Sequence, residues 1–191
     1  MENNYVRIAG QIGAKFIYSH RLFGEEYYMA TVDIQRDSGV VDIIPVMLSG
    51  KQVSLIKKRQ AKWVRVTGCF RSRNVNSHLK LYVFVKSVEF VVEGVYDNFI
   101  SLDCHVCKAP NFRITPLKKK ITDLLVAVNR SFGKTDYIPC IVWWKNAVFA
   151  SKLRIGAHIK ITGRIQSREY LKNGETKTAY EMTAYYLERS E

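Results

Sequence analysis

An internal repeat constrains the fold of this chain more than any other feature of its sequence. The segment DIQRDSGVVDIIPVMLSGK (residues 33–51) aligns with AVNRSFGKTDYIPCIVWWK (127–145) at a constant offset of 94. Farther along, VTGCFRSR (66–73) aligns with ITGRIQSR (161–168) at an offset of 95, and one inserted residue explains the change. Self-similarity at this period indicates a duplicated domain.

The repeat divides the 191-residue chain into two halves of similar length. We expect a first domain over residues 1–95 and a second over 96–191. The joint falls near EGVYDN (93–98), where a glycine and an Asp-Asn pair interrupt two apolar runs.

Each half reads as short strands rich in Val, Ile and Tyr, with one brief helix between the third and fourth strands. The helix expected in the second half is NAVFASKLRIG (146–156), with Gly156 as a possible C-cap, and Asn173-Gly174 predicts a hairpin turn. The strands expected in that half cover residues 99–107, 121–130, 136–144, 158–170 and 177–188. Five strands with a helix after the third predict an all-β chain of two tandem OB-folds, each a five-stranded Greek-key barrel.

The charge balance favours a polyanionic partner. Thirty Lys and Arg residues stand against seventeen Asp and Glu residues, which gives a formal net charge of +13. The opening MENNYVRIAG has neither the basic start nor the apolar stretch of a signal peptide, and no run approaches the roughly twenty apolar residues of a membrane span. We therefore expect a cytoplasmic protein without a membrane partner.

The sequence offers no convincing catalytic or metal site. Cys104 and Cys107 form the pair CHVC, but no second Cys or His pair follows at zinc-finger spacing, so structural, reduced cysteines are expected. The four histidines are scattered, and no phosphate-binding GxxxxGK loop occurs. Asp42 and Asp136 recur in the two halves and are interpreted as turn residues. We expect no enzyme, no cofactor and no catalytic residue.

Three motifs in the second half carry a resemblance to a known family. They are AVNRSFGKTDYIPCIVWWKNA, GAHIKITGRIQSREY and TAYEM. Together they resemble the core of bacterial single-stranded-DNA-binding proteins, over residues 99–188 closely and over 4–92 more faintly. The chain is most similar to the tandem, two-OB-fold members found in clostridia-like bacteria, and the resemblance implies a role in DNA replication, recombination or repair, with an association with the nucleoid.

The resemblance implies four positions where bases stack on aromatic rings. They are Phe132 at the end of the second strand, Tyr137 and Trp143 at either end of the third, and Tyr170 just past the fourth. Strand geometry agrees independently, because Tyr137 and Trp143 are six residues apart and so share one face, about 20 Å apart. Trp144 has the opposite parity, and we expect it to pack in the core or at the barrel end.

Basic residues surround these aromatic positions and are candidates for phosphate contacts. Arg164 and Arg168 are favoured among them because their even spacing places both on one side of a strand. For any single residue, a solvated surface charge is the alternative. The candidates are Arg130, Lys134, Lys145, Arg164, Arg168, Lys118, Lys119 and Lys120.

The first half lacks an aromatic residue at every one of the four stacking positions. The corresponding residues are Ser38, Ile43, Ser49 and Val75, although the barrel-forming pattern remains. We therefore expect the second domain to be the principal DNA-binding domain and the first to be a degenerate copy. The first copy either guides the DNA backbone through basic residues such as Arg71 and Arg73 or serves assembly.

The resemblance also implies a homodimer, because family members commonly assemble four OB-folds. The chain ends in AYYLERSE, so the family's acidic C-terminal tail for partner docking is not expected. Two alternatives to single-stranded DNA binding stay open: an assembly module that contacts proteins, as in primosome-type adaptors, and a protein that binds single-stranded RNA.

Overall fold

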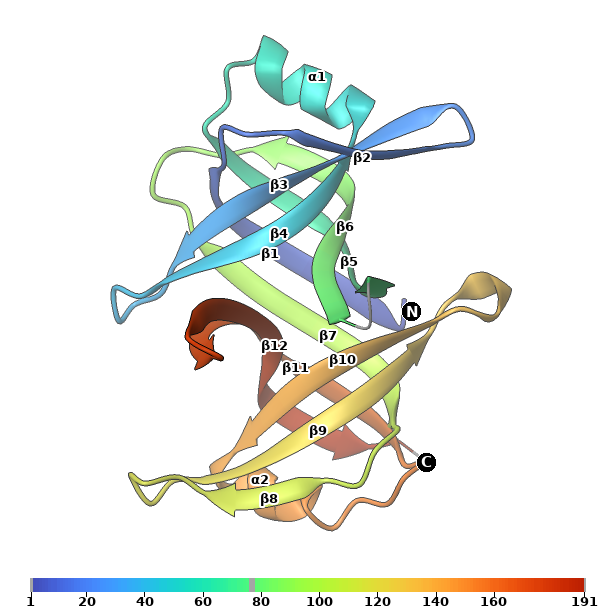
Figure 1. Cartoon of the computed structure of the whole chain (residues 1–191), viewed down its shortest axis with the longest axis vertical. Coiled ribbons are helices and arrows are strands. Elements are labelled where there is room, and N and C mark those ends of the chain that lie inside the picture. Colours follow the sequence, from blue (N-terminus) through green and yellow to red (C-terminus); the bar gives the residue numbers. More distant parts are fainter. Residues whose placement is uncertain (1, 76–77, 191) are drawn as a thin grey trace.

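The computed structural model describes residues 2–75 and 78–190, and each half forms a barrel of antiparallel and parallel strands (Figure 1). In the first half, β1 pairs with β3 and β5, β4 pairs with β3 and with β6 in parallel, and β5 pairs with β6, which closes the ring. The elements are β1 (Asn4–Ile12), β2 (Ile17–Leu22), β3 (Glu25–Gln35), β4 (Val41–Ser49), α1 (Gly50–Lys58), β5 (Trp63–Val75) and β6 (His78–Phe90).

The second half repeats this plan. Strand β7 pairs with β9 and β11, β10 pairs with β9 and with β12 in parallel, and β11 pairs with β12. The elements are β7 (Asp97–Val106), β8 (Asn111–Ile114), β9 (Lys120–Asn129), the short 3-10 helix η1 (Ser131–Gly133), β10 (Thr135–Trp143), α2 (Trp144–Ala150), β11 (His158–Lys172) and β12 (Glu175–Arg189). The predicted pair of tandem OB-folds is confirmed.

The five strands predicted in the second half are all present within a few residues of their expected ends. The hairpin turn is also confirmed, since Asn173 and Gly174 both have positive φ, 54° and 77°. Two expectations were wrong. Strand β8 was missed, and α2 begins at Trp144 and ends at Ala150 instead of covering 146–156, so Gly156 lies in the turn before β11 and caps no helix.

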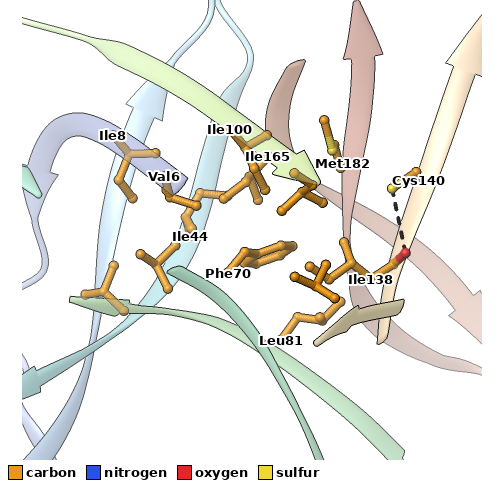
Figure 2. Packing of buried hydrophobic residues seen from close by; sticks show 14 of the residues in the cluster. Val6, Ile8, Ile44, Phe70, Leu81, Ile100, Ile138, Cys140, Ile165 and Met182 are labelled. Atoms are coloured by element: carbon orange, nitrogen blue, oxygen red, sulfur yellow. Dashed lines mark hydrogen bonds between the residues drawn. The ribbon is translucent and has the colours of Figure 1, made fainter. Parts of the chain in front are cut away.

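The hydrophobic core runs through both halves. Alternate residues of the strands point inward, and the buried side chains of the two barrels form one contiguous cluster. Figure 2 shows members from both halves together, including Phe70 and Ile44 from the first and Ile138 and Met182 from the second.

The two barrels also share a sheet, because the first strands of the two halves pair with each other. Strands β1 and β7 are antiparallel, with a register that runs from Asn4 opposite Leu102 to Ala9 opposite Asp97. Arg7 Nε lies 2.5 Å from Asp97 Oδ2 at the end of this ladder. The shared sheet fixes how the second barrel is oriented relative to the first.

A reciprocal pair of buried carboxylates joins the barrels further. Asp42 Oδ1 accepts a hydrogen bond from the backbone N–H of Ser167 in the second half (2.7 Å), and Asp136 Oδ1 accepts one from the N–H of Ser72 in the first half (2.7 Å). Both aspartates lie within strands and are fully buried, so their interpretation as turn residues was wrong. The duplicated sequence has thus produced a pseudo-twofold junction.

Candidate nucleic-acid interface

Strand β10 presents an aromatic face to solvent. Its even-numbered residues are buried, with Ile138 and Cys140 in the barrel core, whereas Tyr137 is 44% exposed and Trp143 is half-buried. Tyr137 and Trp143 therefore lie on the same outer face, as the strand period requires. A row of rings on one side of a strand suits stacking of successive bases.

The main chain of Tyr137 is held by the first barrel. Its N–H donates a hydrogen bond to Ser72 Oγ on β5 (2.8 Å), and the same serine contacts Asp136. The aromatic face of the second barrel is thus positioned from both sides of the junction.

Phe132 lies in the turn between β9 and β10, beyond the end of the strand where it was expected. Its side chain is 99% exposed, and its φ of 64° places it in the left-handed region that bulky residues rarely adopt. Phenylalanine side chains are usually buried, so a fully exposed one on a strained turn is typical of a contact site.

Tyr170 lies within β11, which continues to Lys172, and it is 38% exposed. The Arg168 guanidinium carbon lies 5.9 Å from the centre of its ring. Tyr170 lines a groove of about 510 Å³ between the barrels, to which Pro45 and Tyr82 of the first half and Pro139 of the second also contribute. The structure therefore places Tyr170 where the two halves meet.

Trp144 was expected in the core, but it is 58% exposed and begins α2 with a φ of 58°. The strand ends at Trp143, so the alternation that predicted an inward side chain no longer applies. Lys119 Nζ lies 5.8 Å from the centre of the Trp144 ring, within the range of a cation–π contact.

A pocket of about 650 Å³ adjoins these tryptophans, and it includes a residue that the sequence analysis missed. Trp143, Trp144 and Tyr185 line it together with Lys145 and Thr183. Tyr185 is 60% exposed and falls at the register shift between β11 and β12. Two aromatic residues in a row, Tyr185-Tyr186, were the only available signal, and strand alternation across a bulge could not assign their faces.

The candidate phosphate-binding side chains differ in exposure and in whether they already form ion pairs. Arg130 Nε lies 3.0 Å from Asp136 Oδ2, and Arg168 Nε lies 3.3 Å from Glu181 Oε1, so both guanidinium groups are anchored by buried carboxylates. Arg164 is half-buried. The remaining lysines lie in turns or at element ends, where Lys118, Lys120, Lys134 and Lys145 are exposed and Lys119 is half-buried.

The equivalent positions of the first barrel keep the geometry without the rings. Ile43 is 47% exposed on the outer face of β4, as Tyr137 is on β10, and Val75 ends β5 with 38% exposure. Ser38 lies in the turn between β3 and β4. Ser49 caps α1, since its Oγ accepts from the Gln52 N–H (3.3 Å) and its own N–H donates to Gln52 Oε1 (2.8 Å).

The cysteines are free thiols placed for packing. Cys104 and Cys140 are buried, and burial raises the pKa of Cys104 to about 12, so it stays protonated at neutral pH. Within residues 2–75 and 78–190, no three His, Cys, Asp or Glu side chains lie close enough together to hold a metal ion. Neither helix in this part of the chain has the length and apolar character needed to cross a membrane.

The fold and this surface define a class of protein: a tandem OB-fold chain with an aromatic and basic face. Residues 97–189 match the single-strand binding protein family. The resemblance to bacterial single-stranded-DNA-binding proteins is therefore confirmed, and the family match lies in the second half of the chain.

Curated relatives match the second half of the chain. Single-stranded DNA-binding protein 2 of Listeria innocua is 35% identical over 80 residues, covering 38% of this chain and 50% of the relative. Single-stranded DNA-binding protein 3 of Streptococcus agalactiae is also 35% identical over 80 residues, covering 38% and 58%. This chain thus matches about half the length of these relatives.

A solved structure matches both halves. The wild-type single-stranded DNA binding protein from Thermus aquaticus superposes with a TM-score of 0.79 at 20% sequence identity, covering 98% of this chain and 93% of that one. A deletion mutant of the same protein gives a TM-score of 0.80. At this identity the likeness establishes the shared fold of the two barrels.

Proposed function

We propose that this protein binds single-stranded DNA with little dependence on sequence, mainly through its second OB-fold (residues 96–191). Bases stack on Phe132, Tyr137, Trp143 and Tyr170, while nearby Lys and Arg side chains neutralise phosphates. The protein acts as a binding protein in DNA replication, recombination or repair in the bacterial cytoplasm, on nucleoid DNA.

The observation that carries this proposal is the outward aromatic row of β10. Tyr137 and Trp143 share a solvent-facing side of one strand, and Phe132 is fully exposed in the turn at its start. Stacking is sequence-tolerant because every base has a π-face, and it contributes about 1–3 kcal/mol per base. The net charge of +13 adds a phosphate term that does not depend on sequence.

We also infer that the chain acts as a homodimer, which would bring four OB-folds together. Exposed apolar side chains on the β2–β3 hairpin of the first barrel support an assembly role for that copy. Ile17 is 65% exposed and Phe23 is 99% exposed in this hairpin. Sedimentation of the purified chain tests the dimer directly.

The first experiment is a tryptophan-fluorescence titration with a poly-thymidine oligomer, comparing the wild type with Trp143→Ala. The variant should lose about 1–3 kcal/mol of affinity. Trp63→Phe is the control, because Trp63 at the start of β5 packs against Tyr96, just before β7 (5.2 Å between ring centres), far along the chain from β10.

Undiminished affinity in Trp143→Ala would contradict the stacking role. Absence of any oligomer binding by the wild type would instead favour the assembly module. Competition between thymidine and uridine oligomers of equal length separates DNA from RNA binding.

A further inference from the structure

The turn that carries Phe132 lies against the first barrel. Asn3 Nδ2, just before β1, donates a hydrogen bond to the carbonyl of Asn129 at the end of β9 (2.6 Å). The Asn3 carbonyl accepts from the N–H of Asp103 (2.8 Å). The end of the β9–β10 hairpin is thus fastened to the N-terminal strand of the other half.

A groove of about 570 Å³ forms where this turn meets β5 and β6. Its lining includes four cationic side chains and a single carboxylate, Glu2. The cations come equally from the two barrels: Arg71 and Lys86 from the first, Arg130 and Lys134 from the second. Phe132 stands at its edge with its ring fully exposed.

The two cations of the first barrel, Arg71 and Lys86, are held in place, but only Lys86 has a carboxylate partner among the residues that line the groove. The Arg71 guanidinium carbon lies 3.8 Å from the centre of the Phe84 ring, and its Nε atom is buried with no hydrogen-bond partner among the described residues. Lys86 pairs with Glu2 through an exposed contact of 2.6 Å. Stacking on a ring holds the Arg71 guanidinium in a fixed orientation at the groove, where its planar set of donors suits an incoming anionic group.

The pseudo-twofold counterpart of this groove has a different chemistry. The repeat and the strand registers give the equivalent positions. Gln166 corresponds to Arg71, Thr183 corresponds to Phe84, and Tyr185 corresponds to Lys86. In the turn between β3 and β4, Ser38 and Val40 stand at the positions of Phe132 and Lys134. The counterpart keeps a cation at Arg36 and gains one at Arg164, in place of Arg130 and Cys69, but it has none at the positions of Arg71, Lys86 and Lys134 and no ring at that of Phe132. The duplicated architecture alone therefore does not require these four residues.

We propose that this groove is a composite binding site for one or two nucleotides of single-stranded DNA, in which Phe132 stacks a base and Arg71 and Lys86 hold the adjoining phosphates. The strand then runs along β10 from Trp143 past Tyr137 to Phe132 and continues onto the first barrel. The first OB-fold, although it has no aromatic platform, contributes directly to binding. This inference rests on the proposed function.

The test compares Arg71→Gln and Lys86→Gln with the wild type and with Lys62→Gln, each titrated with a long thymidine oligomer at several salt concentrations. Lys62 is exposed just before β5, nine positions from Arg71 along an extended strand, so its variant carries the same change of net charge away from the groove. Each groove variant should weaken binding about eightfold at about 50 mM salt and reduce the slope of log affinity against log salt by about 0.7.

A double-mutant cycle links the two barrels. Arg71→Gln combined with Phe132→Ala should cost less than the two single changes multiplied together, because both remove contacts to the same nucleotides. Thermal unfolding of each variant checks that the barrels are intact. Since Lys86 is exposed, its variant tests the site even if Arg71→Gln disturbs the stack on Phe84.

The outcomes separate this inference from the function on which it rests. If the wild type binds, Trp143→Ala weakens binding, and both groove variants match Lys62→Gln, the composite site is refuted while the proposed function stands. If the wild type does not bind thymidine oligomers at all, both are refuted.

Discussion

Two hydrogen bonds across the junction predict different losses of stability when the matched serines Ser72 and Ser167 are changed to alanine. Ser72 Oγ accepts from the Tyr137 N–H (2.8 Å), and Ser167 Oγ accepts from the Ile43 N–H (3.1 Å). The change to alanine removes only the hydroxyl in each case, and the hydrogen bond from the serine N–H to the aspartate remains. Any intrinsic strand preference of alanine enters both variants equally.

The magnitudes differ because the two sites differ in access to water. Ser72 is 7% exposed and its hydrogen bond from the Tyr137 N–H is part-buried, so Ser72→Ala leaves that N–H with restricted access to water, at a cost of about 2 kcal/mol. Ser167 is half-buried and its hydrogen bond from the Ile43 N–H is exposed, so water replaces the lost acceptor and Ser167→Ala costs about 0.5–1 kcal/mol.

Urea unfolding of the two variants measures this difference. For a chain of this size, Ser72→Ala should also lower Tm by about 4–8 °C, and Ser167→Ala by about 1–4 °C. Equal m-values confirm that the same transition is compared. Equal losses in the two variants, or a loss below about 0.5 kcal/mol for Ser72→Ala, would refute the argument that access of water to each hydrogen bond sets its contribution to the free energy of unfolding.

Two other features give measurable outcomes. A Cβ at Gly163 would lie 1.9 Å from the carbonyl oxygen of Thr183, so Gly163→Ala should cost about 3 kcal/mol or more in urea unfolding, whereas Gly50→Ala, which meets only ordinary contacts, should cost little. Burial raises the pKa of Asp136, against the opposing effects of the Ser72 N–H and Arg130, so its folded pKa lies above the unfolded value. Its contribution to stability is then greatest at low pH and is lost as pH rises through the folded pKa. The stability of the wild type relative to Asp136→Asn should therefore fall as the pH rises above about 4, and a difference that rises with pH would contradict this sign.

The sequence predicted the barrels because their signals are local. Alternation of apolar residues located the strands, and Asn173-Gly174 located a hairpin whose two φ values are positive. Strand β8 was missed because all four of its residues are exposed, so it has no buried face to produce alternation. The start of α2 was misplaced because no capping side chain marks it.

The candidate site was predictable where it follows strand geometry. Tyr137 and Trp143 share a face because they lie on one regular strand, whereas parity failed for Trp144 once the strand ended. The composite groove depends on contacts between residues 60 or more positions apart, such as those around Arg71 and Phe132. No local pattern encodes that proximity.

The two halves share the residues that build the junction and differ at the residues proposed to face DNA. Asp42 and Asp136, like Ser72 and Ser167, are identical at equivalent positions, and these are the residues that join the barrels. A junction built from reciprocal contacts needs the same donor and acceptor on each side, because each copy satisfies the other's buried groups.

The divergent positions follow a different requirement, which Ser49 and Trp143 illustrate. Both stand at the end of a strand and at the N-cap of the following helix, where a serine contributes about 1 kcal/mol by accepting a backbone hydrogen bond. Ser49 does this in a capping box for the nine-residue α1, while Trp143 makes no side-chain cap for the seven-residue α2. One position cannot both cap a helix and offer a flat ring to a base. The second barrel therefore gives up helix stability for an aromatic surface, which fits its proposed role as the main binding copy, while the first keeps the cap and, in our proposal, contributes through the charges on β5 and β6.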